Sequence, residues 1–153
     1  MSYKMDFKTR NNNPVGEGKA EEYYKKKGVF LERYGLDLLD SGISVGDFCK
    51  IPKVIRNTPD YIAINKGFAF VEVKAFKGRF LRLKLEDMES YNFWSGMGGL
   101  VFFFWSIDYS TNTQIRYENM AKLINENNYE IQKYEDNNKE YYLIPWGDLK
   151  PRS

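Results

Sequence analysis

Residues 59–75 of the chain read PDYIAINKGFAFVEVKA, a stretch that predicts a β-hairpin. Two runs rich in β-branched and aromatic residues flank the glycine-containing segment 65–67, which is typical of the turn of such a hairpin. Side chains in a strand alternate between the two faces of a sheet, so Glu72 and Lys74 share one face while the valines beside them occupy the other. The second strand of the hairpin therefore carries two opposite charges on one face.

The first strand of the hairpin opens with Asp60, directly after Pro59. Antiparallel pairing brings the start of one strand opposite the end of its partner, so we expect Asp60 to lie opposite the Glu72 end of the second strand. Two carboxylates placed in this way could bind Mg²⁺ through oxygen, with water and a substrate phosphate completing its coordination. Lys74 could then orient a metal-bound water and stabilise the charge that develops on the phosphate.

The residues that are missing from the chain exclude several kinds of catalytic chemistry. There is no histidine, so serine and cysteine hydrolases that use a histidine base and metal sites built on imidazole are excluded. The single cysteine, Cys49, excludes an intrachain disulfide and a thiolate zinc cluster. An enzyme with this composition works with carboxylates, lysine, tyrosine and hard cations bound through oxygen.

The length of 153 residues is typical of a single domain, which at this size buries roughly 68–70% of the surface of its unfolded chain. Hydrophobic residues make up 42% of the chain, yet no apolar run approaches the roughly 20 residues that a membrane-spanning helix needs. The longest apolar run, 100–105, predicts a buried strand. Because the N-terminal residues also lack the apolar stretch of a secretory signal, we expect a cytoplasmic protein that does not enter a membrane.

The whole pattern predicts an α/β fold, with a central mixed β-sheet flanked by helices and with a C-terminal helix and hairpin. The polar, asparagine-rich residues 1–13 predict a flexible arm, so the single domain spans 14–153. The sequence predicts a helix over 14–27 followed by a strand over 29–34, and the alternative to this strand is that the helix continues through Tyr34. Gly28 ends the predicted helix, and the other predicted elements are an irregular segment over 35–50, a short edge segment over 51–55, a helix over 83–94, a strand over 100–107, a helix over 119–127 and a hairpin of 129–134 with 141–145.

A basic stretch follows the first hairpin, although the net charge of the whole chain is only +2. Residues 77–84 contain Lys77, Arg79, Arg82 and Lys84 and no acid. Cations gathered in this way bind the phosphate backbone of a nucleic acid, a contact that sets affinity and position without reading the base sequence. We therefore expect these four residues to bind DNA.

The order of Asp60 and then Glu72-Val73-Lys74 resembles the signature of the PD-(D/E)XK nucleases, which include restriction enzymes, phage nucleases and archaeal Holliday junction resolvases. The succession of an acidic helix, a strand, the signature hairpin, a helix and a buried strand is also similar, over about residues 14–107. The resemblance implies a restriction-endonuclease-like core with 108–153 as a C-terminal extension. It also implies Mg²⁺ as the cofactor, with Mn²⁺ as a substitute.

Members of that family usually carry one more acid on the first helix, often a few residues after a glycine. Glu21 and Glu22 follow a glycine at a similar spacing, and Glu22 is the better match to the resolvases. The resemblance therefore implies Asp60, Glu72, Lys74 and Glu22 as catalytic residues, with the three acids as metal ligands. One departure is that many members place a glutamine on the helix after the lysine, where this chain has a run of acids around a methionine.

Together, these features predict a Mg²⁺-dependent endonuclease that hydrolyses DNA phosphodiester bonds, and the family resemblance implies that it acts as a homodimer. Similarity to the resolvases favours a structure-selective enzyme that cuts branched or junction DNA. One alternative is a sequence-specific endonuclease of the homing or restriction type, whose specificity would reside in residues 35–58 or in the C-terminal hairpin. The other alternative is a non-catalytic nucleic-acid-binding module on the same fold.

Overall fold

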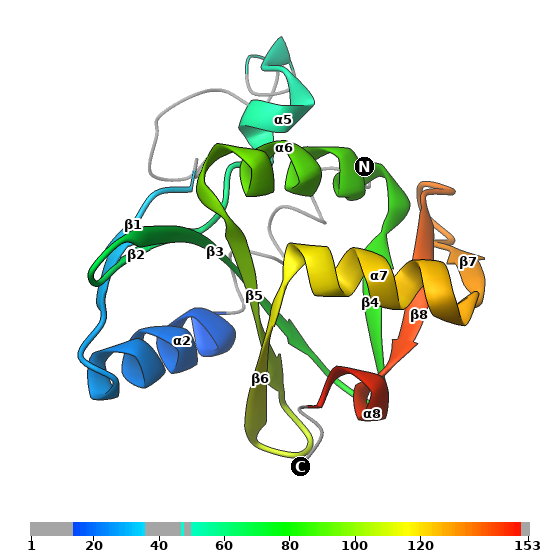
Figure 1. Cartoon of the computed structure of the whole chain (residues 1–153). Coiled ribbons are helices and arrows are strands. Elements are labelled where there is room, and N and C mark those ends of the chain that lie inside the picture. The colour runs from blue at the N-terminus through cyan, green and yellow to red at the C-terminus, as the bar shows by residue number, and fades with distance from the viewer. Residues whose placement is uncertain (1–13, 36–46, 48–49, 151–153) are drawn as a thin grey trace.

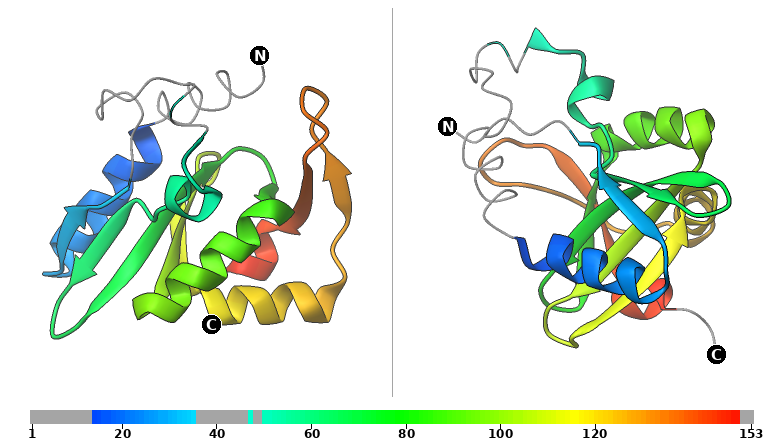
Figure 2. Two further views of the ribbon diagram at one scale, coloured as in Figure 1. Left: turned by 90° about the horizontal axis from the view of Figure 1, so that it is seen from above. Right: turned by 90° about the vertical axis from the view of Figure 1, so that its left-hand side faces the viewer.

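The computed structural model of the chain describes residues 14–35, 47 and 50–150 (Figure 1). These residues form two sheets that contribute to one large hydrophobic core, with helices on both sides of the larger sheet (Figure 2). The predicted arm 1–13 lies outside the described residues, and so does most of the predicted irregular segment 35–50.

The larger sheet has five strands, namely β1 (Phe30–Arg33), β2 (Tyr61–Ile64), β3 (Phe68–Phe76), β5 (Leu100–Ser106) and β6 (Thr111–Arg116). Their order across the sheet is β1-β2-β3-β5-β6. β2 and β3 form the predicted hairpin, with Tyr61 opposite Val71. β3 runs parallel to β5 whereas the other neighbours are antiparallel, so the predicted mixed sheet is confirmed.

Different helices cover the two faces of this sheet, and they are α2 (Pro14–Lys26), α6 (Met88–Gly98) and α7 (Tyr117–Asn127). α2 covers one face, where Ala20 and Tyr24 pack in a small cluster with residues of β2, β3 and β5. α6 and α7 lie on the opposite face (Figure 1). The first helix ends as predicted, because Gly28 follows it with a left-handed φ of 71°.

The smaller sheet contains three strands, namely β4 (Phe80–Lys84), β7 (Ile131–Lys133) and β8 (Glu140–Pro145). Their order is β4-β8-β7, and both pairs are antiparallel. The predicted C-terminal hairpin is therefore confirmed, and it pairs with a strand that lies directly after the β2–β3 hairpin in the chain. The short α8 (Trp146–Leu149) follows β8.

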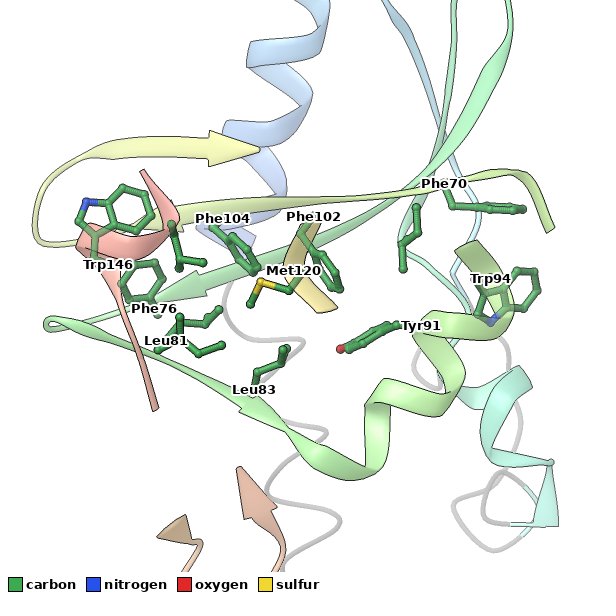
Figure 3. Packing of buried hydrophobic residues seen from close by; sticks show 13 residues of the cluster. Phe70, Phe76, Leu81, Leu83, Tyr91, Trp94, Phe102, Phe104, Met120 and Trp146 are labelled. Carbon is green, nitrogen blue, oxygen red and sulfur yellow. The ribbon is translucent and has the colours of Figure 1, made fainter. Parts of the chain in front are cut away.

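The main core fills the space between the larger sheet and β4, β8 and the helices α6 and α7. In Figure 3, Met120 of α7 lies between the rings of Phe102 and Phe104 on β5 and the leucines of β4. Phe102 and Phe104 are fully buried and their rings stack at 5.4 Å between centroids. Tyr91 of α6 meets Phe102 edge-on at 4.9 Å, which fixes the helix over β5.

The predicted edge segment over 51–55 is wrong, because residues 53–56 form the short helix α5 (Lys53–Arg56). The carbonyl of Pro52 accepts bonds from the backbone N–H groups of Ile55 and Arg56, which closes a helical turn. The indole Nε1 of Trp94 on α6 donates to the carbonyl of Val54 at 2.9 Å. α5 is thus held by a contact with α6 that no local pattern of the sequence reveals.

The predicted helix over 83–94 begins too early. Residues 80–84 form β4, and after the 3₁₀ turn η1 (Leu85–Asp87) the helix α6 starts only at Met88. The side chains of β4 alternate, since Leu81 and Leu83 are buried and Arg82 between them is exposed, as expected for a strand with one face on a core. Part of the basic stretch therefore lies on a strand.

Two further elements, β6 and α8, were not predicted. β6 consists mainly of polar residues, and Thr113 is its only buried member, so it shows no apolar alternation. It is an edge strand that β5 holds through backbone pairing. None of the helices among the described residues is long and apolar enough to cross a membrane.

Candidate active site

Asp60 lies at the start of β2, where its carboxylate reaches the backbone of β3. The register that pairs Tyr61 with Val71 places Asp60 opposite Glu72 when it is continued by one residue. Oδ2 of Asp60 accepts a hydrogen bond of 2.8 Å from the backbone N–H of Val73. The carboxylate is thus fixed against the segment between Glu72 and Lys74, as the hairpin pattern predicts.

The backbone of Asp60 is held by the end of β1. Its carbonyl accepts bonds of 2.9 and 3.1 Å from the N–H groups of Tyr34 and Gly35. Gly35 approaches so closely that a Cβ atom there would lie 3.2 Å from both Cα of Asp60 and the carbonyl oxygen of Pro59. A larger residue at position 35 would therefore have to displace the backbone that carries the Asp60 carboxylate.

Glu72 and Lys74 form an ion pair on β3, with 4.0 Å between Oε2 and Nζ. Their side chains are 14% and 24% exposed. Phe70 and Phe76 lie on the same face of β3 by strand alternation, and both are buried in the main core. The residues that pair with Glu72 and Lys74 on β5 are the two stacked phenylalanines. The pair is consequently a charged interruption of an apolar layer.

The ring of Tyr91 supports Lys74. Nζ of Lys74 lies 5.8 Å from the centre of this ring, within the range of a cation–π contact. Tyr91 is only 2% exposed and projects from α6 (Figure 3). The aromatic face therefore limits the directions in which the ammonium group can point.

A buried polar cluster joins the segment before Asp60 to the start of α6. The side-chain amide of Asn57 donates to Oδ1 of Asp87 at 3.1 Å and to the hydroxyl of Ser90 at 3.3 Å. Asp87 and Ser90 are 9% and 3% exposed. Since Asn57 lies three residues before Asp60 and Ser90 directly precedes Tyr91, this cluster connects the supports of Asp60 and Lys74.

The acids of α2 contact the sheet through Arg33 and Tyr61. Arg33 forms two hydrogen bonds to the Glu17 carboxylate, at 2.8 and 3.3 Å, and one to the Tyr61 hydroxyl at 3.3 Å. The bonds to Glu17 raise the pKa of Arg33 above its usual range, although burial acts in the other direction. The Tyr61 hydroxyl donates to Glu21 at 2.6 Å, and burial followed by this bond raises the pKa of Tyr61.

Glu22, the acid that best matches the family spacing, does not join this network. It is exposed on α2 and lies 3.8 Å from Nζ of Lys19, one helical turn away. In residues 14–35, 47 and 50–150, no group of three or more carboxylate or thiol side chains is arranged to hold a metal ion. The structure thus brings together Asp60, Glu72 and Lys74, and it leaves the metal-binding role of Glu22 as a prediction.

The four predicted DNA-binding residues lie along the turn after β3 and on β4. Lys77 and Arg79 flank Gly78 in that turn, where the left-handed φ of Gly78 is 83°. The guanidinium of Arg82 lies 5.3 Å from the ring centre of Tyr141, and Nζ of Lys84 lies 5.6 Å from that of Tyr134. These tyrosines belong to the C-terminal hairpin, and their rings are 4.3 Å apart. The hairpin therefore orients two of the four cations.

Several supports of the site were missed by the sequence analysis. Tyr91 lies within the helix predicted over 83–94, and Asp87 belongs to the run of acids around a methionine, but neither pattern predicts a role at the site. A buried acid at the start of a helix has no distinct sequence signal. Glu17 has only the signal of an acid in the first turn of a helix, which is common there and does not predict a contact with an arginine on the next strand.

Comparison with known proteins finds a solved structure with a similar fold. No protein-family profile and no curated protein matches the sequence. Among solved structures the chain is similar to D212, a nuclease from a fusselovirus, with a TM-score of 0.51 and 14% sequence identity. The matched region covers 92% of this chain and 83% of the D212 chain. The chain therefore shares its α/β fold with a viral nuclease over most of its length.

Proposed function

We propose that the chain is a metal-dependent endonuclease that hydrolyses DNA phosphodiester bonds at Asp60, Glu72 and Lys74. The observation that carries the proposal is the Glu72–Lys74 pair, which lies in an apolar layer beside the fixed carboxylate of Asp60. Charges removed from water in this way lower stability, and ionisable groups in such settings cluster at functional sites. The likeness of the fold to a viral nuclease supports the same assignment.

The chemistry of this site fits Mg²⁺, with Mn²⁺ as a substitute. Asp60 and Glu72 offer carboxylate oxygens, and Mg²⁺ is commonly held by one or two carboxylates while water and substrate phosphates complete its octahedron. A bound Mg²⁺ would supply a water of lowered pKa and positive charge beside the phosphate. Lys74 would donate hydrogen bonds to the attacking water and to the phosphate. Glu22 is proposed as a further ligand, which would have to leave Lys19 and reach around the end of the sheet, because α2 covers the face opposite to Glu72 and Lys74.

The proposed substrate is branched or junction DNA, which the protein would cut as a homodimer. Sequence-specific cleavage of linear DNA is the alternative within the same class. The cations at Lys77, Arg79, Arg82 and Lys84 would bind the phosphate backbone in either case. A non-catalytic binding module is the alternative from another class, and the ion pair between Glu72 and Lys74 argues against it, since binding alone gives no reason to keep these charges in an apolar layer.

We expect cleavage to require Mg²⁺ or Mn²⁺ and to stop in excess EDTA. Ca²⁺ should support binding with little turnover, because its looser coordination positions a water poorly. The measurement is cleavage of linear, flapped and four-way DNAs of matched length. Preference for the flapped or four-way substrates supports structure selectivity, whereas cleavage of linear DNA at one site supports the sequence-specific alternative. Full activity in EDTA would contradict the mechanism, and binding without cleavage under every metal condition would favour the non-catalytic module.

The double variant Arg79→Ala and Arg82→Ala is expected to weaken binding to all DNAs alike. Each lost phosphate contact should also flatten the dependence of log K on log salt by about one unit. Binding titrations across a range of salt concentrations measure both effects. Lys122→Ala, which removes an exposed cation from α7, serves as the control and should leave the slope unchanged. A double variant with an unchanged slope would show that these arginines do not contact phosphates.

A further inference from the structure

Exposed apolar side chains lie at one end of the larger sheet and at the end of α6. On the sheet, Phe30 pairs with Ile64, and Ile64 pairs with Phe68, so the three residues lie side by side on one face of β1, β2 and β3. Their exposed fractions are 60%, 42% and 55%. Phe30 lies on β1, which is an edge strand of this sheet.

The stripe extends to the end of α6, where the Phe68 ring approaches Gly98. A Cβ atom at Gly98 would lie 2.6 Å from Cε2 of Phe68, so the absence of a side chain at Gly98 lets this ring pack against the helix. Met97 is next to Gly98, and Phe93 lies one helical turn earlier. Met97 and Phe93 are 59% and 45% exposed. We call the five residues Phe30, Ile64, Phe68, Phe93 and Met97 the apolar stripe.

We propose that the apolar stripe is the surface through which two copies of this chain form a two-fold dimer. The inference deepens the homodimer of the proposed function by assigning its interface. Large side chains offer roughly 150–250 Å² each, so five that are about half exposed present on the order of 500 Å² of apolar surface. A standard interface buries about 800 Å² per partner, of which about 60% is apolar. The stripe has the apolar area that one partner of such an interface contributes.

A second copy fits this surface better than a different partner because of where the stripe lies. Phe68 and Glu72 project from the same face of β3 and are four residues apart, or about 13 Å along the strand. A two-fold axis through the stripe would therefore place the two Glu72 side chains on the order of 30 Å apart, close to one helical turn of DNA at about 34 Å. Two sites at that spacing can act on two strands of one substrate. The flanking charges Glu32 and Lys66 are of opposite sign, so two copies do not meet with like charge alone.

The test is sedimentation equilibrium of the full chain with three proteins. The wild type should be a dimer at concentrations of about 10–100 µM, and Met97→Glu should raise the dissociation constant by at least about 100-fold, because two like charges would enter one desolvated interface. Ile131→Glu is the matched control, since Ile131 is an exposed apolar residue on β7, outside the stripe, and it should leave the dimer intact. A second stripe variant, Phe30→Glu, lies on β1 and should also dissociate the dimer. Its effect would show that dissociation by Met97→Glu does not come from local disruption of α6.

The outcomes separate this inference from the proposed nuclease activity. A monomeric wild type, or stripe variants that remain dimeric, would overturn the interface whatever the activity is. A dimeric wild type that becomes monomeric in both stripe variants but not in Ile131→Glu supports it, even if no DNA is cleaved. On a duplex that the wild type cuts, the monomeric variants should nick single strands at the wild-type rate per chain and lose the coordinated cleavage of both strands. Cleavage of both strands in one binding event by a monomeric variant would contradict the inference.

Discussion

Lys74→Ala is expected to lower the single-turnover rate of DNA cleavage by about 10²–10³-fold, the usual effect of removing one group that stabilises charge in the transition state. Nζ of Lys74 lies 4.0 Å from Glu72 and 5.8 Å from the centre of the Tyr91 ring, so the ammonium is directed by its neighbours. Affinity for DNA should change little, because a single cation inside the site contributes less than the basic stretch. The measurement is rapid-mixing cleavage with enzyme in excess at saturating Mg²⁺.

Folding has to be separated from chemistry for this variant. We expect the free energy of unfolding of Lys74→Ala to fall by no more than about 1 kcal/mol, because the lysine is partly exposed and its ion pair is long. Lys122→Ala is the control, since Lys122 is an exposed lysine on α7, outside the site and the apolar stripe, and this variant should cleave at the wild-type rate. An unchanged single-turnover rate for a well-folded Lys74→Ala would move the active site elsewhere.

The hairpin could be predicted from the sequence because its information is local. Alternation fixes the faces, the short turn fixes the register, and the register places Asp60 opposite Glu72. The buried strand β5 was also predicted, since a continuous apolar run requires cover on both faces. These features involve neighbours in the chain or a single bulk property, and the structure confirms them.

The smaller sheet could not be predicted because its pairing is not local. Residues 80–84 contain apolar positions that fit a strand and, together with the following residues, also fit a helix. Residues 80–84 form a strand because they pair with β8, which lies about 60 residues further along the chain. The C-terminal hairpin therefore does more than extend the core, since it fixes the strand that carries Arg82 and Lys84.

The apolar surroundings of the Glu72–Lys74 pair could not be predicted from the sequence either. Alternation on β3 places Phe70 and Phe76 on the face of Glu72 and Lys74, yet only the structure shows that α6 and the smaller sheet cover this face. The helix acid illustrates the same limit. The spacing after a glycine favoured Glu22, whereas the contacts with β1 and β2 are made by Glu17 and Glu21, because helix rotation depends on packing that spacing does not specify.

Asp60→Asn is expected to abolish cleavage, by about 10³-fold or more, while the chain remains folded. The substitution keeps an oxygen that can accept the 2.8 Å bond from the backbone N–H of Val73, but it removes the charge of one of the three proposed metal ligands. Loss of a metal that stabilises the transition state by several kcal/mol corresponds to such a factor at 1.36 kcal/mol per tenfold change. Single-turnover cleavage and calorimetric Mn²⁺ titration measure the two effects separately.

Asp60→Ala distinguishes the structural role of this carboxylate from its chemical role. Alanine leaves the N–H of Val73 without its partner, and an unsatisfied donor in a partly buried position costs about 1–3 kcal/mol of unfolding free energy. Both variants should therefore fail to cleave and fail to bind Mn²⁺, but only Asp60→Ala should be clearly less stable in chemical denaturation. If Asp60→Asn cleaves DNA at the wild-type rate, the carboxylate serves only to join β2 to β3, and Glu72 and Lys74 would have to act without it.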